Sequence, residues 1–151
     1  MKSAFAAGPL SDDGIGAIVE QLEAWEGGPT VGERPFQGGG VDFEPLGGAI
    51  NEVAPDETAF VHRDSPFLVQ FVSRWDSSQV TDPTADVQWL RDIDQAVRPH
   101  LSGSSYQNYV DPELDDHLNS YHGANLPRLR EVKSRYDPDN FLRFPQSIPP
   151  L

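Results

Sequence analysis

The sequence predicts an α+β fold, in which an antiparallel sheet carries helices packed on one face. Two observations lead to this prediction: helical spacing of apolar residues over 15–22 and 87–97, and regular alternation along a strand over 67–75. The 151 residues suffice for one unit with its own hydrophobic core, without a disulfide or a structural metal.

The N-terminal part is expected to hold a strand and then a helix. Residues 2–5 have strand-like composition, and Ser11 is a suitable N-cap because two aspartates follow it in the first turn. Beyond Ser11, one apolar helical face is expected to end near Trp25; its members are Ile15, Ile18, Val19 and Leu22.

From 30 to 61, glycines, prolines and short apolar runs alternate, which is typical of short strands joined by turns. The run Gly38-Gly39-Gly40 and the pair Gly47-Gly48 invite comparison with phosphate-binding loops. No Lys-Ser or Lys-Thr pair follows them, however, and their spacing differs from that of dinucleotide-binding loops. We therefore favour tight turns or close packing of strands at these glycines.

The strand over 67–75 is apolar on both of its faces, so we expect helices to cover one face and another part of the chain to cover the other. Gln70 lies on the second face, where a buried amide needs a hydrogen-bond partner. Neighbouring backbone is one candidate for that partner.

Helices dominate the second half of the expected fold. Their order follows from the apolar spacing and from the proline stops. The expected elements are a helix over 82–99, a tyrosine-rich strand over 105–110, a helical turn from 111 to about 121, a helix over 127–136 and an extended tail over 141–151.

The charge disfavours two classes of partner. With 24 acidic and 11 basic residues the net charge is −13, which disfavours binding to nucleic acid and to anionic membranes. The acidic residues are mostly Asp and there are only two lysines, so we expect a halophilic source and a melting temperature that rises in molar salt. No secretory or membrane-spanning segment is visible, and we expect a soluble cytoplasmic protein.

Metal and hydrolase chemistry find little support in the sequence. The closest histidines, His117 and His122, would lie about 140° apart on a helix, which disfavours zinc ligation. The absence of cysteine excludes thiolate catalysis, and no GxSxG motif occurs.

The C-terminal third carries many residues in an order that resembles the C-terminal signature of the berberine bridge enzyme-like family of FAD-linked oxidoreductases. Looser matches lie upstream at Lys2-Ser3, Gly47-Gly48-Ala49, Ala59-Phe60, His62-Arg63 and Trp75. The signature residues are Tyr106-Gln107-Asn108-Tyr109, Asp111, Tyr121, Gly123, Asn125, Arg128-Leu129, Lys133, Tyr136-Asp137-Pro138, Asn140-Phe141 and Gln146-Ser147-Ile148.

The resemblance implies that residues 1–103 are part of a substrate domain and that 104–151 are the berberine-like C-terminal segment. The family holds FAD mostly in a separate N-terminal domain, which this chain lacks. An FAD-binding domain, joined in cis or supplied in trans, is therefore an expected partner.

The resemblance also implies roles for individual residues. Tyr106 is expected to be the catalytic base, Asn108 to contact the flavin, and Gln70 to lie over the flavin ring as a second catalytic residue. A phenol that acts as a base near neutral pH needs nearby positive charge or hydrogen-bond donors. On an extended strand Asn108 would project to the same side as Tyr106, and Tyr109 to the other side, where it would pack.

Three positions depart from the family pattern and leave the substrate open. They are Leu118, where a nearby Trp is usual, His122, where an aromatic ring is usual, and Leu68, where plant members often have Lys.

The implied function is oxidation of a hydroxylated small molecule, an alcohol or a sugar, by hydride transfer to FAD. Two alternatives remain: a stand-alone, non-catalytic domain without flavin, and a binding protein that uses the sheet face. If a face formed by Leu68, Gln70 and Val72 normally covers a flavin domain, the isolated chain should expose it and self-associate.

Overall fold

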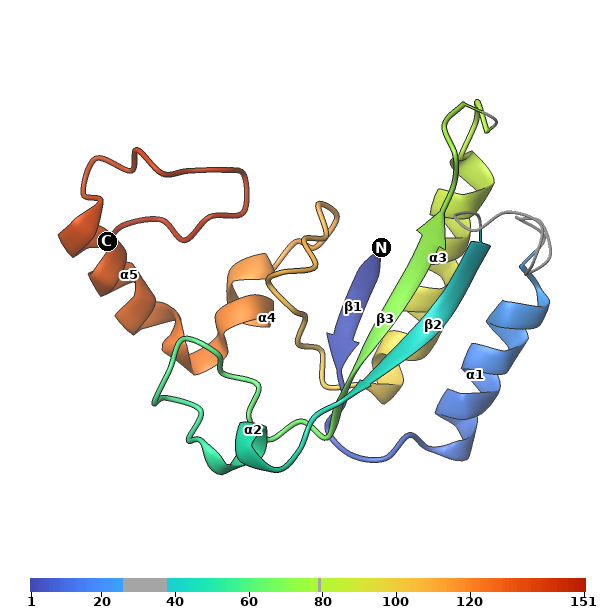
Figure 1. Ribbon diagram of the computed structural model, residues 1–151, viewed down its shortest axis with the longest axis horizontal. Coiled ribbons are helices and arrows are strands. Elements are labelled where there is room, and N and C mark those ends of the chain that lie inside the picture. The colour runs from blue at the N-terminus through green and yellow to red at the C-terminus, as the bar shows by residue number, and fades with distance from the viewer. Residues whose placement is uncertain (26–37, 79) are drawn as a thin grey trace.

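The computed structural model describes residues 1–25, 38–78 and 80–151 (Figure 1). Its sheet consists of β1 (Lys2–Phe5), β2 (Gly38–Pro45) and β3 (Phe67–Arg74), in the order β1-β3-β2, with both pairs antiparallel. The predicted α+β fold is confirmed, and so are the strands at 2–5 and 67–75. No helix in the described ranges has the length and apolar character needed to cross a membrane.

Two helices cover one face of the sheet. They are α1 (Asp12–Glu23) and α3 (Thr84–Val97), and the 3₁₀ turn Arg98–His100 continues α3. The core between helices and sheet consists of Ile18, Val69, Phe71, Trp89, Leu90, Ile93 and Val97. This face of β3 is covered by helices, as the alternation predicted.

The start of α1 agrees with the sequence, but its apolar face does not. The Ser11 hydroxyl accepts the backbone N–H of Gly14 at 3.1 Å, as expected of an N-cap. Of the four residues on the predicted apolar face, Ile18 is in the core, whereas Ile15, Val19 and Leu22 are 49%, 47% and 38% exposed. The part of α1 that packs in the core is therefore narrower than the apolar face that its sequence forms.

Close strand packing explains the central glycine of the run at 38–40. A Cβ on Gly39 would lie 2.9 Å from the Trp25 ring and 3.0 Å from the Val72 carbonyl oxygen. Gly38–Gly40 belong to β2 and pair with β3, in agreement with the packing interpretation. The rest of the glycine-rich region includes the short helix α2 (Ala49–Glu52), and residues 26–37 lie outside the described part.

The C-terminal half differs from the expected strand-helix-helix order. Residues 105–110 form turns instead of a strand, and the helix expected from 111 begins only at His117, as α4 (His117–His122). The 3₁₀ turn Gly123–Asn125 joins α4 to α5 (Leu126–Tyr136), which agrees with the predicted last helix. Figure 1 shows α4, α5 and the tail at the opposite end of the molecule from α1.

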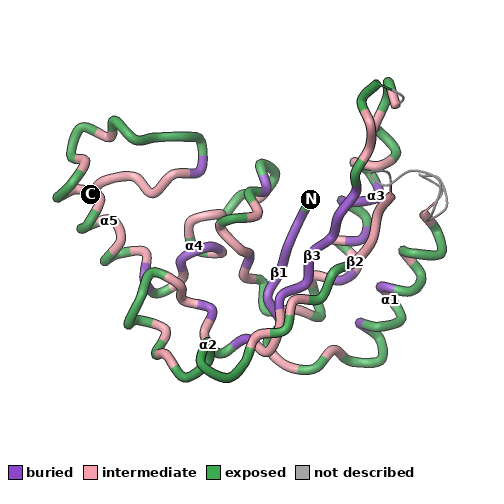
Figure 2. Tube along the Cα trace, in the orientation of Figure 1, coloured by how far each residue is buried: buried purple, intermediate pink, exposed green. Residues whose placement is uncertain are grey.

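Burial is uneven along the molecule. Figure 2 shows buried residues along β1 and β3, whereas α5 and the tail are mostly half-buried or exposed. No residue of α5 is buried. We call residues 126–151 the C-terminal arm; its exposed apolar residues are Val132, Tyr136, Phe141, Leu142, Phe144 and Leu151.

Candidate active site

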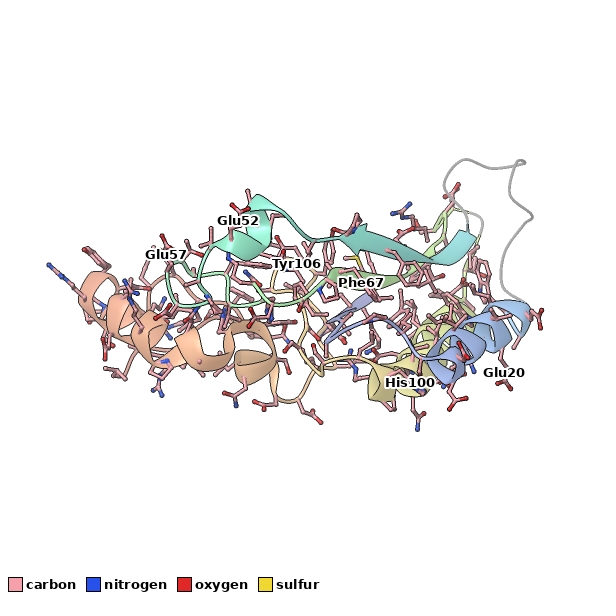
Figure 3. All side chains as sticks on the ribbon, turned by 90° about the horizontal axis from the view of Figure 1, so that it is seen from below. Glu20, Glu52, Glu57, Phe67, His100 and Tyr106 are labelled. Carbon is pink, nitrogen blue, oxygen red and sulfur yellow. The ribbon has the colours of Figure 1, made fainter. Side chains whose placement is uncertain are left out.

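Strand β1 holds the segment that leads to Tyr106. The Phe5 N–H donates to the Ser104 carbonyl at 2.9 Å, and the Ser105 hydroxyl donates to the Ser3 carbonyl at 2.9 Å. The N–H of Tyr106 donates to the Ser3 hydroxyl at 3.2 Å. Tyr106 therefore leaves the sheet edge at a fixed point, between the sheet and the C-terminal helices (Figure 3).

The predicted strand over 105–110 is wrong, yet Tyr106 and Asn108 come together. The Tyr109 N–H donates to the Tyr106 carbonyl at 2.9 Å, which closes a turn. Within this turn, Nδ2 of Asn108 donates to Oη of Tyr106 at 2.9 Å. The turn, and not the period of a strand, brings the two side chains together.

Tyr109 belongs to the same site, contrary to the packing role expected for it. Its ring meets the Tyr106 ring edge-on, with centroids 5.1 Å apart. Its hydroxyl donates to Oε1 of Glu44 at 2.9 Å, and this hydrogen bond is the main reason that the pKa of Tyr109 is raised. The side chain of Gln70 lies near enough to Tyr109 to oppose this rise in pKa by a smaller amount.

Gln70 is buried, with 7% of its surface exposed, as its position on the strand predicted. The structure gives its amide nitrogen a partner other than backbone, the sulfur of Met1, at 3.1 Å. Gln70 and Tyr106 therefore both lie beside Tyr109.

Sequence reasoning missed Glu44 as well as Tyr109. Glu44 pairs with Leu68 and Asp42 pairs with Gln70 across the two strands, so both carboxylates lie on the Gln70 face. The alternation Val41-Asp42-Phe43-Glu44 was the signal that could have found them.

The sheet face expected to be an exposed apolar patch is covered. Leu68, Gln70 and Val72 are all buried. On this face, Phe5 stacks on His62 with centroids 4.0 Å apart and meets Phe60 edge-on. The segment before β3 therefore covers the Phe5 end of this face.

A ring of hydrogen bonds fixes the far side of the Tyr106 turn. The Asp111 N–H donates to the Tyr121 hydroxyl at 3.0 Å, and that hydroxyl donates to Oε1 of Gln146 at 3.1 Å. The Gln146 amide donates back to the Asp111 carbonyl at 2.7 Å. The three buried residues join the turn, α4 and the tail.

A buried ion pair ties the same turn to the sheet. Nζ of Lys2 lies 2.9 Å from Asp111 and 3.1 Å from Glu113, which also binds Arg91 of α3. Burial disfavours the charged form of Lys2, but the two carboxylates outweigh it and raise its pKa. Together these contacts give Tyr106 and Asn108 a rigid support.

Comparison with known proteins covers the segment that carries Tyr106 and Asn108. The family model described as berberine and berberine like matches residues 105–149. The chain is 36% identical over 147 residues to an FAD-linked oxidoreductase of Bacillus subtilis, YgaK, covering 97% of this chain and 30% of that protein. It is 34% identical to a carbohydrate oxidase of Microdochium nivale over 108 residues, which cover 68% of this chain and 21% of the oxidase.

A solved structure gives the same result for the fold. The wild-type BBE-like 1 protein of Physcomitrella patens superposes with a TM-score of 0.81 at 33% identity, covering 98% of this chain and 29% of that one. The chain thus spans about 30% of the length of the relatives that it matches. It belongs to the berberine bridge enzyme-like family and corresponds to a C-terminal portion of its members.

Proposed function

We propose that this chain supplies the substrate-facing part of an FAD-dependent oxidoreductase that oxidises a hydroxylated small molecule, of the alcohol or sugar type. The carbohydrate oxidase among its relatives supports this substrate class. The observation that carries the proposal is the hydrogen bond from Asn108 to the phenol oxygen of Tyr106.

Tyr106 is the proposed base. In the reaction it takes the proton from the substrate hydroxyl while the hydrogen on the adjacent carbon leaves with its electron pair, so that a carbonyl forms. A hydrogen-bond donor on the phenol oxygen stabilises the negative charge of the phenolate that accepts this proton. Asn108 is that donor, and the turn holds it in place before substrate arrives.

Gln70 is the second proposed catalytic residue. It lies on the sheet face beside Tyr109, and its amide offers a donor and an acceptor at a fixed position. In this proposal Gln70 orients the substrate hydroxyl toward Tyr106. Glu44 accepts a hydrogen bond from Tyr109 and so fixes the position of the Tyr109 ring beside Gln70 and Tyr106.

FAD, when bound, supplies the acceptor for the hydride. The described residues could hold only a ring-sized part of this cofactor, in a cavity of about 300 Å³ lined in part by Gln107 and Asn108. That volume is at the lower end of the range for small-molecule sites. The remainder of FAD would be held by a flavin-binding domain, in cis or in trans.

The C-terminal arm supports such a partner. Phe141 is 85% exposed, and Leu142, Phe144 and Leu151 of the arm's tail are exposed as well. Apolar surface of this kind, when it is contiguous, marks interaction sites. We place the flavin-binding partner against the arm.

A chimera tests the base assignment. This chain replaces the matching segment of the B. subtilis relative, and anaerobic flavin reduction is followed by stopped-flow absorbance with a sugar or alcohol substrate. Tyr106→Phe should slow reduction by about a hundredfold or more. Val19→Ala, which alters an exposed residue of α1 at the other end of the molecule, should leave the rate unchanged. An undiminished rate in Tyr106→Phe would contradict the proposal.

A further inference from the structure

A second concave surface, a groove of about 470 Å³, lies between the end of α1 and the first half of α3. Figure 1 shows that these helices run in opposite directions, at the opposite end of the molecule from the C-terminal arm. Among the described residues, two tryptophans, two alanines and three polar side chains line the groove. Its volume is within the range of small-molecule sites.

The aromatic part of the groove is a fixed pair of rings. The centroids of Trp25 and Trp89 are 5.2 Å apart, and their planes are tilted by 34°. Trp89 is buried and its indole N–H donates to the Gln21 carbonyl at 2.8 Å, whereas Trp25 is half-buried and offers accessible ring surface. The indole nitrogen of Trp25 is buried as well. A ligand therefore meets the rings as apolar surface and not as N–H donors.

Small side chains keep the groove open above these rings. Ala24 at the end of α1 and Ala85 at the start of α3 are both exposed, and both line the groove. A large side chain at either position would occupy space that is now free for a ligand.

The polar lining comes from both helices. Gln88 and Asp92 are exposed and lie one turn apart on α3, where Nε2 of Gln88 donates to Oδ1 of Asp92 at 2.8 Å. This hydrogen bond orients the two side chains, and each has a second oxygen that can accept from a ligand. The amide of Gln21, on α1, adds a donor and an acceptor to the other wall.

Charge and ring geometry restrict the class of ligand. No lysine or arginine is among the described residues that line the groove, so an anion would meet the Asp92 carboxylate without a counter-charge. A cation favours aromatic rings that enclose it on several sides. Rings tilted by only 34° form a platform instead, and a platform suits a flat, neutral ligand.

We infer that this groove is a binding site for the ring of a neutral sugar. Such a ring has C–H groups on its face and hydroxyl groups around its edge. The C–H face packs on Trp25, and the hydroxyl groups bind Gln21, Gln88 and Asp92. The site is separate from Tyr106, and the inference does not depend on the oxidation proposed above.

Tryptophan fluorescence of the 151-residue chain tests the inference. Two of the three tryptophans line the groove, and Trp75→Phe removes the emission of the third. Cellobiose, which has two linked sugar rings, should change the emission saturably. Sorbitol has similar hydroxyl groups but no ring face, and choline is a cation that packs on indole rings. Neither sorbitol nor choline should produce a saturable change.

Variants at exposed positions locate the binding site. Replacing Gln88 and Asp92 together by alanine should weaken cellobiose binding by about tenfold, because two hydrogen-bonding side chains are lost. Gln95→Ala, at an exposed glutamine of α3 that does not line the groove, should have no effect.

Filling the groove provides a second test. Ala85→Phe should abolish cellobiose binding, and Ala49→Phe, at an exposed alanine of α2, should leave it unchanged. The comparison of cellobiose with sorbitol uses the unmodified groove and so gives an answer even if a variant fails to fold.

Four results would overturn the inference. They are the absence of a saturable response to cellobiose, an equal response to sorbitol, tighter binding of choline, and full cellobiose binding by Ala85→Phe. Each leaves the assignment of Tyr106 to the separate test in the chimera.

Discussion

Asn108 donates a hydrogen bond of 2.9 Å to the hydroxyl of Tyr106, two residues away along a turn that is anchored to β1 on one side and to Tyr121 on the other. The bond places an amide donor on the oxygen that would carry negative charge in the proposed reaction.

Loss of this donor should slow the proposed reaction. In the chimera, Asn108→Leu is expected to lower the rate of flavin reduction by about a hundredfold, because the phenolate loses a fixed donor. Asn119→Leu changes another exposed asparagine, whose amide binds Asp116, and serves as the control. Equal rates in the two variants would show that Asn108 does not support Tyr106.

The Lys2–Asp111 pair should contribute more to stability than the neighbouring Arg91–Glu113 pair. Lys2→Met leaves the buried Asp111 carboxylate without its cation, and we expect a loss of about 3 to 5 kcal/mol in the free energy of unfolding. Arg91→Met removes an exposed partner and should cost much less, because solvent screens an exposed ion pair. Urea denaturation at pH 7 measures both, and similar losses would contradict the difference in burial.

Stability should fall on mild acidification because of His62. Burial is the main cause that lowers the pKa of His62 from 6.5 to about 4 in the folded protein. Between pH 6.5 and pH 4 the histidine is protonated more readily in the unfolded chain than in the folded protein. The contribution of neutral, buried His62 to the free energy of unfolding is therefore present above about pH 6.5 and is lost as the pH falls toward 4. The loss amounts to at most about 3 kcal/mol.

Urea denaturation between pH 7.5 and pH 4.5 tests this pH dependence. His62→Gln should flatten the dependence in this range, although His122, whose pKa is also lowered by burial, keeps part of it. His100→Gln, at an exposed histidine, is the control. A slope that His62→Gln leaves intact would show that His62 is not the group responsible.

Two adjacent glycines of β2 should respond oppositely to alanine. Gly39→Ala places a methyl group against the Trp25 ring and the Val72 carbonyl and should cost about 1 to 3 kcal/mol. Gly40→Ala meets no atom within 4 Å and should be neutral or slightly stabilising. Thermal denaturation of the two variants decides whether close packing is the reason for glycine at 39.

The isolated chain should bind hydrophobic dyes through its C-terminal arm. Replacing Phe141, Leu142 and Phe144 together by serine should reduce dye fluorescence and any self-association seen by size-exclusion chromatography. The matched control is Ile15→Ser with Val19→Ser, on the exposed side of α1. If the control lowers the signal and the arm variant does not, the interaction surface lies on α1.

The local elements were predictable wherever a short-range pattern determined them. The Ser11 cap, the alternation of 67–75 and the periodicity of α3 and α5 depend on residues a few positions apart, and the structure agrees with them. Gln70 could be expected to be buried for the same reason. The strand expected at 105–110 failed because tertiary hydrogen bonds to Ser3 and Tyr121 favour a turn over any local β preference.

By itself, the sequence determined the fold class and the acidic character of the chain, and it pointed to Tyr106, Asn108 and Gln70 as candidate site residues. Only the tertiary structure decided that Asn108 reaches the Tyr106 hydroxyl, that Tyr109 and Glu44 join them, and that the apolar surface lies on the arm instead of the sheet. The physical reason is distance along the chain. Lys2 and Asp111 are 109 residues apart and Tyr109 and Glu44 are 65 apart, so no local pattern encodes their contacts.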